Sequence, residues 1–188
     1  MSARTRVGGD LAAGDSASAK VSPATDVDVD RGADLVITRT FAAPRALLWR
    51  AWTDPEHIRS WWGPREHPAA APTGAPPIRC EVDLRVGGAF RLDVCGPDGG
   101  LYPCRGRFRE IVEPERLVFD GEAGEGHPCG AGLPPRAVVT VTFTEVAGGT
   151  RLTHHTRFAS ADGRDAAVHA GYDTAWKTSL DRLAGHLE

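Results

Sequence analysis

The chain has 188 residues and a formal net charge of -3, which favours a single domain and offers no basic surface for nucleic acid or an anionic membrane. No apolar run approaches the roughly 20 residues of a membrane-spanning helix, and the N-terminus lacks the apolar core of a secretory signal. Four cysteines are too few for a disulfide scaffold. We therefore expect a cytoplasmic protein whose partners include no nucleic acid and no membrane.

The first 33 residues differ in composition from the rest of the chain. They contain no aromatic residue, and their few aliphatic side chains follow neither a helical nor a strand period. Such a segment cannot bury enough apolar surface to offset the entropy of ordering it. We expect residues 1–33 to be a disordered tail, with a short docked helix as the alternative, and residues 34–188 to form the folded domain. Removing residues 1–32 should then leave the melting temperature nearly unchanged.

The folded part begins with one strand and two short helices. The segment Leu35–Phe41 is rich in β-branched residues, which predicts a strand. Pro44 suits the first position of a helix that continues to about Trp52. Asp54 can cap a second helix, and Pro55 can occupy its first position. The two helices are therefore expected to be short and nearly contiguous.

Six further strand-like runs come next, separated by turn residues and by two loops rich in Gly and Pro, residues 63–77 and 121–136. The runs are Ile78–Leu84, Gly88–Cys95, Leu101–Val112, Arg116–Asp120, Ala137–Val146 and Thr150–Phe158. Because no helix intervenes between them, the pattern excludes a doubly wound parallel sheet and predicts an antiparallel meander.

The last segment predicts one long helix. Its apolar residues recur every three or four positions and form a single stripe. They are Val168, Tyr172, Trp176, Leu180, Leu183 and Leu187. A sheet of about seven strands must carry such a helix on one face, so sheet and helix enclose apolar volume that the short helices can close at one end.

Several motifs in this chain resemble one known family. They include Ile37-x-Arg39-x-Phe41-x-Ala43-Pro44, Trp61-Trp62-Gly63-Pro64, Glu81-Val82-Asp83-Leu84-Arg85-Val86-Gly87-Gly88, Pro114-Glu115-Arg116-Leu117-Val118 and Ser179-Leu180-Asp181-Arg182-Leu183. Over about residues 34–187 the pattern resembles the SRPBCC (START-like, helix-grip) superfamily, in the branch named after the activator of the heat-shock-protein-90 ATPase. The resemblance implies an α+β helix-grip fold, with a curved antiparallel sheet of about seven strands around a long C-terminal helix and two short helices after the first strand. The proline-rich segment before Ile78 and the loop around residues 127–132 depart from the pattern.

The family resemblance implies the fold more specifically than it implies the function. Members of the superfamily include binders of hydrophobic small molecules, polyketide cyclases, resistance proteins and chaperone co-factors. The chain contains no nucleophile elbow, Walker loop, zinc-protease motif, dinucleotide fingerprint or kinase signature. The pair His127-x-Cys129 has no second pair at metal-ligand spacing. We expect no cofactor and no metal ion, and we assign no catalytic residue.

Strand parity and the helical period direct eight side chains toward the enclosed space, as candidate ligand-binding residues. They are Arg39, Trp61, Phe90, Leu92, Phe108, His154, Tyr172 and Trp176. Trp61 is expected near the entrance. The alternatives are ordinary core packing for the rings, a core histidine bonded to a neighbouring hydroxyl for His154, and an ion pair at the sheet edge for Arg39.

These patterns together predict a protein that binds a hydrophobic or aromatic small molecule in a cavity between the sheet and the C-terminal helix, and they lean away from enzymatic activity. One alternative is a polyketide cyclase or aromatase, in which His154, Arg39 or Tyr172 would assist proton transfer. Another is a chaperone-associated interaction module, which a filled cavity and an exposed apolar patch would favour. A homodimer is kept as an open alternative for the oligomeric state.

The cysteines are expected to be four free thiols. Matching the inward faces of the two strands pairs Val94 with Cys104 and turns Cys95 to the other face. A two-residue turn at Gly99-Gly100 would instead set Cys95 directly opposite Cys104, within reach of a disulfide.

Overall fold

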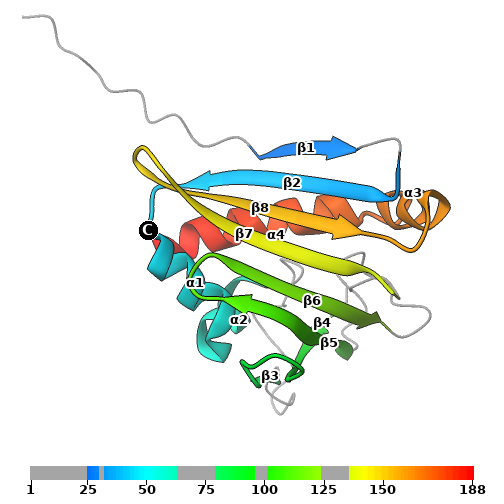
Figure 1. Ribbon diagram of the computed structural model, residues 1–188, viewed down its shortest axis with the longest axis horizontal. Helices are drawn as coiled ribbons and strands as arrows, with labels where there is room; N and C mark the ends of the chain where they lie inside the picture. Colours follow the sequence, from blue (N-terminus) through cyan, green and yellow to red (C-terminus); the bar gives the residue numbers. More distant parts are fainter. Residues whose placement is uncertain (1–24, 30–31, 63–78, 96–100, 124–135) are drawn as a thin grey trace, which may run out of the picture.

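The computed structural model describes residues 25–29, 32–62, 79–95, 101–123 and 136–188. The strands are β1 (Asp26–Val29), β2 (Asp34–Phe41), β3 (Cys80–Val82), β4 (Ala89–Cys95), β5 (Leu101–Val112), β6 (Arg116–Ala123), β7 (Val138–Val146) and β8 (Gly149–Arg157). The helices are α1 (Arg45–Thr53), α2 (Pro55–Trp61), α3 (Ala161–His169) and α4 (Tyr172–Leu187). The strands form one antiparallel sheet in the order β1-β2-β8-β7-β6-β5-β4-β3 (Figure 1). The predicted α+β helix-grip fold is confirmed.

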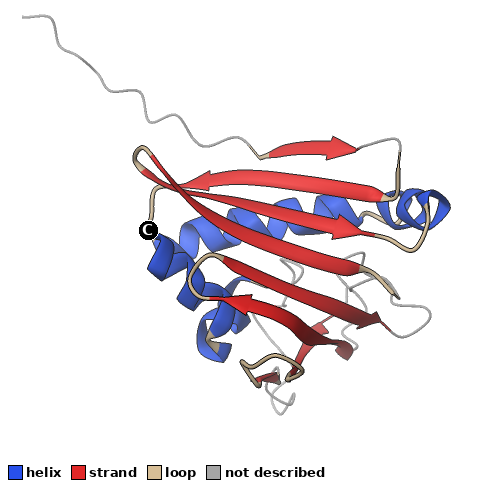
Figure 2. Cartoon of the chain, in the orientation of Figure 1, coloured by secondary structure: helices blue, strands red, loops and turns tan. Residues whose placement is uncertain are grey.

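The core lies between the inner face of the sheet and the helices. Figure 2 shows α4 running behind the strands, with α1 and α2 beside its C-terminal end. Side chains on β2 alternate between buried and half-buried, as a strand with one covered face requires. The buried stripe of α4, which includes Trp176, Leu180 and Leu183, covers the part of the sheet near β2.

The first strand of the sheet lies inside the segment expected to be disordered. β1 pairs with β2, with Val27 opposite Ile37, and the Val27 side chain packs against the core. The prediction of disorder over residues 1–33 is therefore wrong for Asp26–Val29. Its four residues alternate polar and apolar in strand fashion, but the run is too short to stand out as a sequence signal. Residues 1–24 and 30–31 lie outside the described residues.

The terminal helix is broken, which corrects the prediction of a single long one. Gly171 adopts a φ of 87°, in the left-handed region that favours glycine, between the end of α3 and the start of α4. The apolar repeat passes from Val168 to Tyr172 in an ordinary step of four. The break is therefore invisible to periodicity alone, although the stripe on α4 is as expected.

The two short helices follow their predicted signals. The Asp54 side chain accepts a hydrogen bond from the Glu56 backbone N–H at 2.9 Å, and Pro55 begins α2. Pro44 precedes α1 as its cap residue rather than occupying its first position. Because Asp54 alone separates the helices, the rings of Trp52 and Trp61 meet, with centroids 4.8 Å apart.

The β4–β5 hairpin has a register that neither alternative predicted. Cys104 lies opposite Leu92, and Cys95 lies opposite Leu101. A slip of two residues leaves every side chain on the same face, so the inward pattern could not distinguish this register from the one that pairs Val94 with Cys104. Cys80 is a buried free thiol, and the Cys104 side chain is also buried. The Cys95 side chain and Cys129 lie outside the described residues, so the count of four free thiols stays a prediction.

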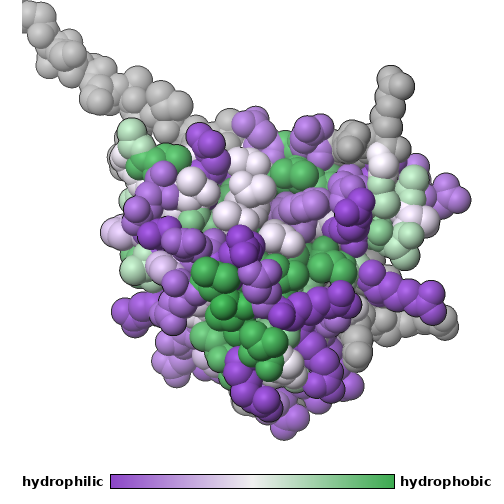
Figure 3. Space-filling model, viewed as in Figure 1, coloured by the Kyte–Doolittle hydropathy of each residue, from purple (hydrophilic) through white to green (hydrophobic). Residues whose placement is uncertain are grey.

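The outer face of the sheet is mostly polar. In Figure 3 charged and neutral side chains cover most of it, and hydrophobic ones gather at and below the middle of the view. Arg105, Arg107 and Arg109 are exposed on β5, and Arg109 pairs with Asp120 at 2.8 Å. Within the described residues, no helix is both long and apolar enough to cross a bilayer. The loop predicted over residues 121–136 begins later, since β6 continues to Ala123; most of it, like residues 63–77, is not described.

Candidate functional site

A cavity lies beneath the half of the sheet formed by β3, β4, β5 and β6, where α1 and α2 cover the inner face. The described residues that line it are Trp52, Ile58, Trp62, Cys80, Glu81, Val82, Phe90, Arg91, Leu92, Phe108, Leu117 and Phe119. The space inside it that can hold a water-sized sphere amounts to about 20 Å³. This is room for about one water molecule, far below the roughly 300–1,000 Å³ of small-molecule sites, so the cavity is a set of narrow gaps between rings.

Aromatic rings form the walls of this cavity. Phe90 meets Phe119 edge to face, with centroids 5.2 Å apart, and lies 5.6 Å from Phe108. Leu92 and Leu117 complete the apolar lining on the same side. Alternation along β4, β5 and β6 directs these residues inward, because every second side chain of a strand points to one face.

Trp62 stands between the cavity and the core beneath α4. It comes directly after the last residue of α2, and its backbone N–H donates to the Ile58 carbonyl at 3.0 Å. Its ring lies 5.0 Å from that of Trp176 and 6.2 Å from that of Phe90, measured between centroids. Trp62 is only half-buried, whereas Trp52 and Trp176 are almost completely covered. It is therefore the ring of this group that can move at the lowest cost in buried area.

A cluster of buried nitrogen atoms adjoins the cavity through Trp52. The rings of Trp52 and Trp176 are parallel within 4°, with centroids 5.8 Å apart, and the His154 ring lies 4.0 Å from that of Trp176. Trp52 Nε1 and His154 Nε2 are buried and have no hydrogen-bond partner among the described residues. Burial lowers the pKa of His154 to about 3, so its ring is uncharged at neutral pH.

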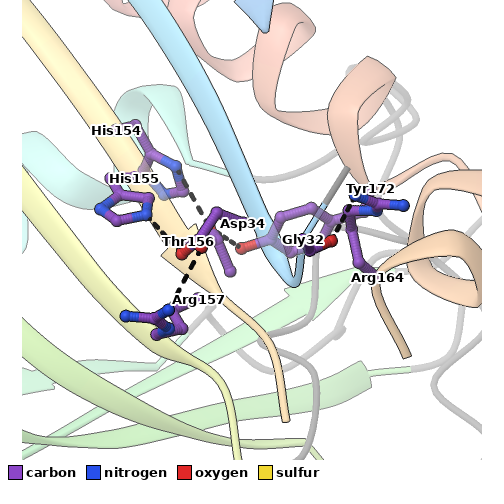
Figure 4. A network of polar contacts seen from close by, with 8 residues as sticks. All are labelled: Gly32, Asp34, His154, His155, Thr156, Arg157, Arg164 and Tyr172. Carbon is purple, nitrogen blue, oxygen red and sulfur yellow. Dashed lines mark hydrogen bonds and ion pairs between the residues drawn. The ribbon is translucent and has the colours of Figure 1, made fainter. Parts of the chain in front are cut away.

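A chain of hydrogen bonds holds His154 from its other side. The Tyr172 and Thr156 hydroxyl oxygens are 3.0 Å apart, and Thr156 Oγ1 lies 3.5 Å from His154 Nδ1 (Figure 4). Burial raises the pKa of the Tyr172 hydroxyl, which therefore stays protonated. His154 thus has the hydroxyl partner proposed as its structural alternative. The adjacent His155 bonds Asp34 on the opposite face, as strand alternation requires.

Arg39 makes the ion pair proposed as its alternative role. Its guanidinium, almost fully buried, donates to the Asp181 carboxylate and to the Thr25 hydroxyl, at 3.2 Å for the latter. It is absent from the described residues that line the cavity. Its inward charge is therefore compensated within the fold.

Of the eight candidate residues, three line the cavity: Phe90, Leu92 and Phe108. His154, Tyr172 and Trp176 form the adjoining cluster. Trp61 corrects the expectation of a ring near the entrance, because it is fully buried and its Nε1 donates to the Ala51 carbonyl at 2.8 Å. Its half-buried neighbour Trp62 lines the cavity instead.

Sequence reasoning missed part of the lining. The local patterns place Trp52 in the core, and they do not single out Ile58, Cys80 or Val82. The parity of β3, which turns Cys80 and Val82 to the same face, is a usable signal only once that strand's bounds are known. The cavity therefore faces α2 more than the terminal helix, contrary to the expected position.

Charged groups at the rim of the cavity are paired. Arg91 Nε lies 3.1 Å from Asp93 Oδ1, and Arg79 Nε lies 3.4 Å from Glu81 Oε1. Burial raises the pKa of the Cys80 thiol to about 11, which makes it a poor nucleophile at neutral pH. The described part of the chain contains no group of three side chains that could hold a metal ion.

Comparison with known families agrees with the fold. The family described as "Activator of Hsp90 ATPase homolog 1-like protein" matches residues 42–188. The chain belongs to this family. The resemblance noted from the sequence motifs is thereby confirmed.

Several solved structures have the same fold as this chain. Protein Ms6760 from Mycobacterium smegmatis is 28% identical with a TM-score of 0.69, covering 86% of this chain and 95% of its own. Protein NE0264 from Nitrosomonas europaea is 26% identical with a TM-score of 0.65, covering 82% and 93% respectively. CalU16 from Micromonospora echinospora, at 22% identity and a TM-score of 0.57, shares the fold over 89% of this chain and 85% of its own. No curated protein matches the chain.

Proposed function

We propose that this member of the family binds a hydrophobic or aromatic small molecule in the cavity beneath β3, β4, β5 and β6. The observation that carries the proposal is an apolar cavity walled by five aromatic rings, those of Trp52, Trp62, Phe90, Phe108 and Phe119. Recognition of a flat ligand needs apolar walls and aromatic faces in an enclosed place. Arg79 and Arg91 at the rim are already paired with Glu81 and Asp93, so these charges do not favour a charged ligand.

Entry of a ligand requires the gaps to widen, and Trp62 is the side chain we assign to that movement. Rotating its ring out of contact with Phe90 and Trp176 would join the separate gaps into one space. The cost is the loss of contacts that a flat ligand in the same place would restore. Trp52, parallel to Trp176 and almost fully buried, would remain as the fixed wall.

The described geometry gives no support to a catalytic role. The groups considered for proton transfer do not reach the cavity: Arg39 pairs with Asp181, Tyr172 bonds Thr156, and His154 is not among the described residues that line it. An uncharged imidazole with a pKa near 3 is also a weak base at neutral pH. We therefore favour binding over a cyclase or aromatase activity.

An interaction module has little apolar surface to use. Within the described residues, the large hydrophobic side chains that are exposed are Leu84 and Val86, both between β3 and β4. Two exposed side chains offer less apolar surface than the several hundred Å² typical of docking sites. The buried free thiol of Cys80 suits a reducing compartment, and we keep the cytoplasm as the proposed location.

Intrinsic tryptophan fluorescence tests the proposal. A panel of flat aromatic compounds is titrated into the wild-type protein, Trp62→Phe and Trp49→Phe. We expect at least one compound to quench the wild type, and Trp62→Phe to lose much of the change because Trp62 lies in the cavity wall. Trp49→Phe is the control, since Trp49 packs on Phe143 away from the lining. No response to any compound, or loss of the response in Trp49→Phe alone, would refute the proposal.

A further inference from the structure

The buried nitrogen atoms beside the cavity restrict the chemistry of its ligand. Trp52 belongs both to the cavity lining and to the group of buried nitrogens that lack a hydrogen-bond partner within the described residues. Its side chain is about 97% buried, since the residue is 3% exposed. An indole N–H can only donate, so a partner for Trp52 Nε1 must be a hydrogen-bond acceptor.

Leaving such a donor without a partner is costly. Buried polar groups are almost always hydrogen-bonded, and an unsatisfied one destabilises a protein by an amount comparable to a lost hydrogen bond. Here two of them, Trp52 Nε1 and His154 Nε2, occur on rings whose centroids lie 6.3 Å apart. Two in one group mark a place where a further polar atom would be stabilised.

The charge of that atom is constrained as well. The basic group in the cavity lining, Arg91, is paired with Asp93, and the inward Arg39 is paired with Asp181. His154 is uncharged at neutral pH. An anionic group placed near Trp52 would lose its hydration without gaining an unpaired cation, which is strongly unfavourable.

We infer that the ligand is a planar, uncharged aromatic compound that carries a carbonyl-type oxygen, and that this oxygen accepts a hydrogen bond from Trp52 Nε1. The inference rests on the proposed function, because it assumes that the cavity takes a ligand. It adds the polar group that the ligand must carry. The rings of Trp176 and Phe90 would contact its aromatic part once Trp62 has moved aside.

Three compounds of one size test the inference. They are 2-acetylnaphthalene, its hydrocarbon analogue 2-isopropenylnaphthalene, and 2-naphthoate as the anion. We expect the ketone to bind the wild type about tenfold more tightly than the hydrocarbon, as one hydrogen bond to a buried donor would give. The anion should bind more weakly than the ketone.

Two variants identify the donor. Trp52→Phe keeps a ring in the wall but removes Nε1, so the ketone should lose its advantage while the hydrocarbon keeps its affinity. Trp49→Phe, outside the lining, should leave the advantage intact. Equal binding of ketone and hydrocarbon to the wild type would overturn the inference and leave the proposed function standing. Failure of all three compounds to bind would overturn both.

A spectroscopic measurement covers the case in which Trp52→Phe does not fold. The infrared carbonyl stretch of 2-acetylnaphthalene is recorded in cyclohexane and bound to the wild-type protein. We expect a lower frequency in the complex, because donation of a hydrogen bond weakens the C=O bond. An unshifted band would contradict the inference.

Discussion

The ring of Phe90 on β4 occupies the place that a side chain of residue 106 would take on β5. A Cβ added to Gly106 would lie 2.4 Å from Phe90 Cε1, 2.5 Å from Phe90 Cζ and 2.2 Å from the Asp120 carbonyl oxygen. Real Cβ atoms essentially never come this close to other heavy atoms. The bare glycine therefore lets the Phe90 ring lie close to the sheet, where it forms one wall of the cavity.

Gly106→Ala should destabilise the protein. The added methyl group must displace both the Phe90 ring and the backbone of β6, and overpacking of this kind costs about 1–3 kcal/mol. Chemical denaturation measures the loss. Gly185→Ala on α4 is the control, since nothing lies within 4 Å of its Cβ position and alanine favours a helix by about 1 kcal/mol. Equal stability of Gly106→Ala and wild type would show that the close approach is not real.

Leu92→Trp should fill the cavity. Because the gaps are narrow, the larger side chain needs Trp62 to move aside, as a ligand would, so the free energy of unfolding should fall by less than the about 1–3 kcal/mol of overpacking a fixed core, while binding of aromatic compounds weakens. Leu152→Trp is the matched control, because Leu152 is fully buried on β8 and does not line the cavity. That change should cost at least about 1–3 kcal/mol. If both variants lose the same stability, the region around Leu92 is packed like the rest of the core.

Residues with a strong local signal were predicted well from the sequence. The cap at Asp54, the alternation that turns His154 inward and the stripe on α4 depend on neighbours within one or two turns. The register of Cys104 and the break at Gly171 were missed, because a slip of two residues or a step of four leaves the apolar pattern unchanged. The positions of Trp52 and Trp62 in the cavity wall depend on how α1 and α2 pack against the sheet. That packing is a tertiary contact, so the local sequence pattern does not predict it.

His154 should make stability depend on pH. Its pKa is about 3 in the folded protein against an ordinary value of 6.5, so between these values the unfolded chain binds a proton that the folded protein does not. Stability therefore falls as the pH drops below 6.5, by up to about 1.4 kcal/mol per pH unit. Between pH 7.5 and 5.0 the contribution is about 2 kcal/mol.

Urea denaturation at the two pH values measures this contribution. His154→Leu, which removes the titrating group, should lose about 2 kcal/mol less than the wild type on going to pH 5.0. Leu183→Ala, which lowers stability at both pH values without removing a titrating group, should keep the wild-type difference. The same pH dependence in His154→Leu and wild type would mean that the His154 ring is not excluded from solvent.

Two truncations separate β1 from the residues before it. Deleting residues 1–24 should leave the melting temperature nearly unchanged, as their composition predicts. Deleting residues 1–33 also removes the pairing of β1 with β2, the Thr25 hydroxyl that Arg39 contacts and the Gly32 carbonyl that Arg164 contacts. We expect a loss of several degrees, measured by circular dichroism. Equal melting temperatures of the two truncated chains would contradict a stabilising role for β1.

The central claim, that the cavity beneath β3–β6 takes an aromatic ligand, is tested most directly by methyl NMR. The protein is labelled at Ile, Leu and Val methyl groups and titrated with 2-acetylnaphthalene. Binding in the cavity predicts large shifts, from the ring current of the ligand, at Ile58, Val82, Leu92 and Leu117, which line it. The methyl groups of Leu35, Leu152 and Leu183, buried elsewhere, should move little. Spectra that stay unchanged to the solubility limit of the compound, or shifts centred on Leu35, Leu152 and Leu183, would contradict the claim.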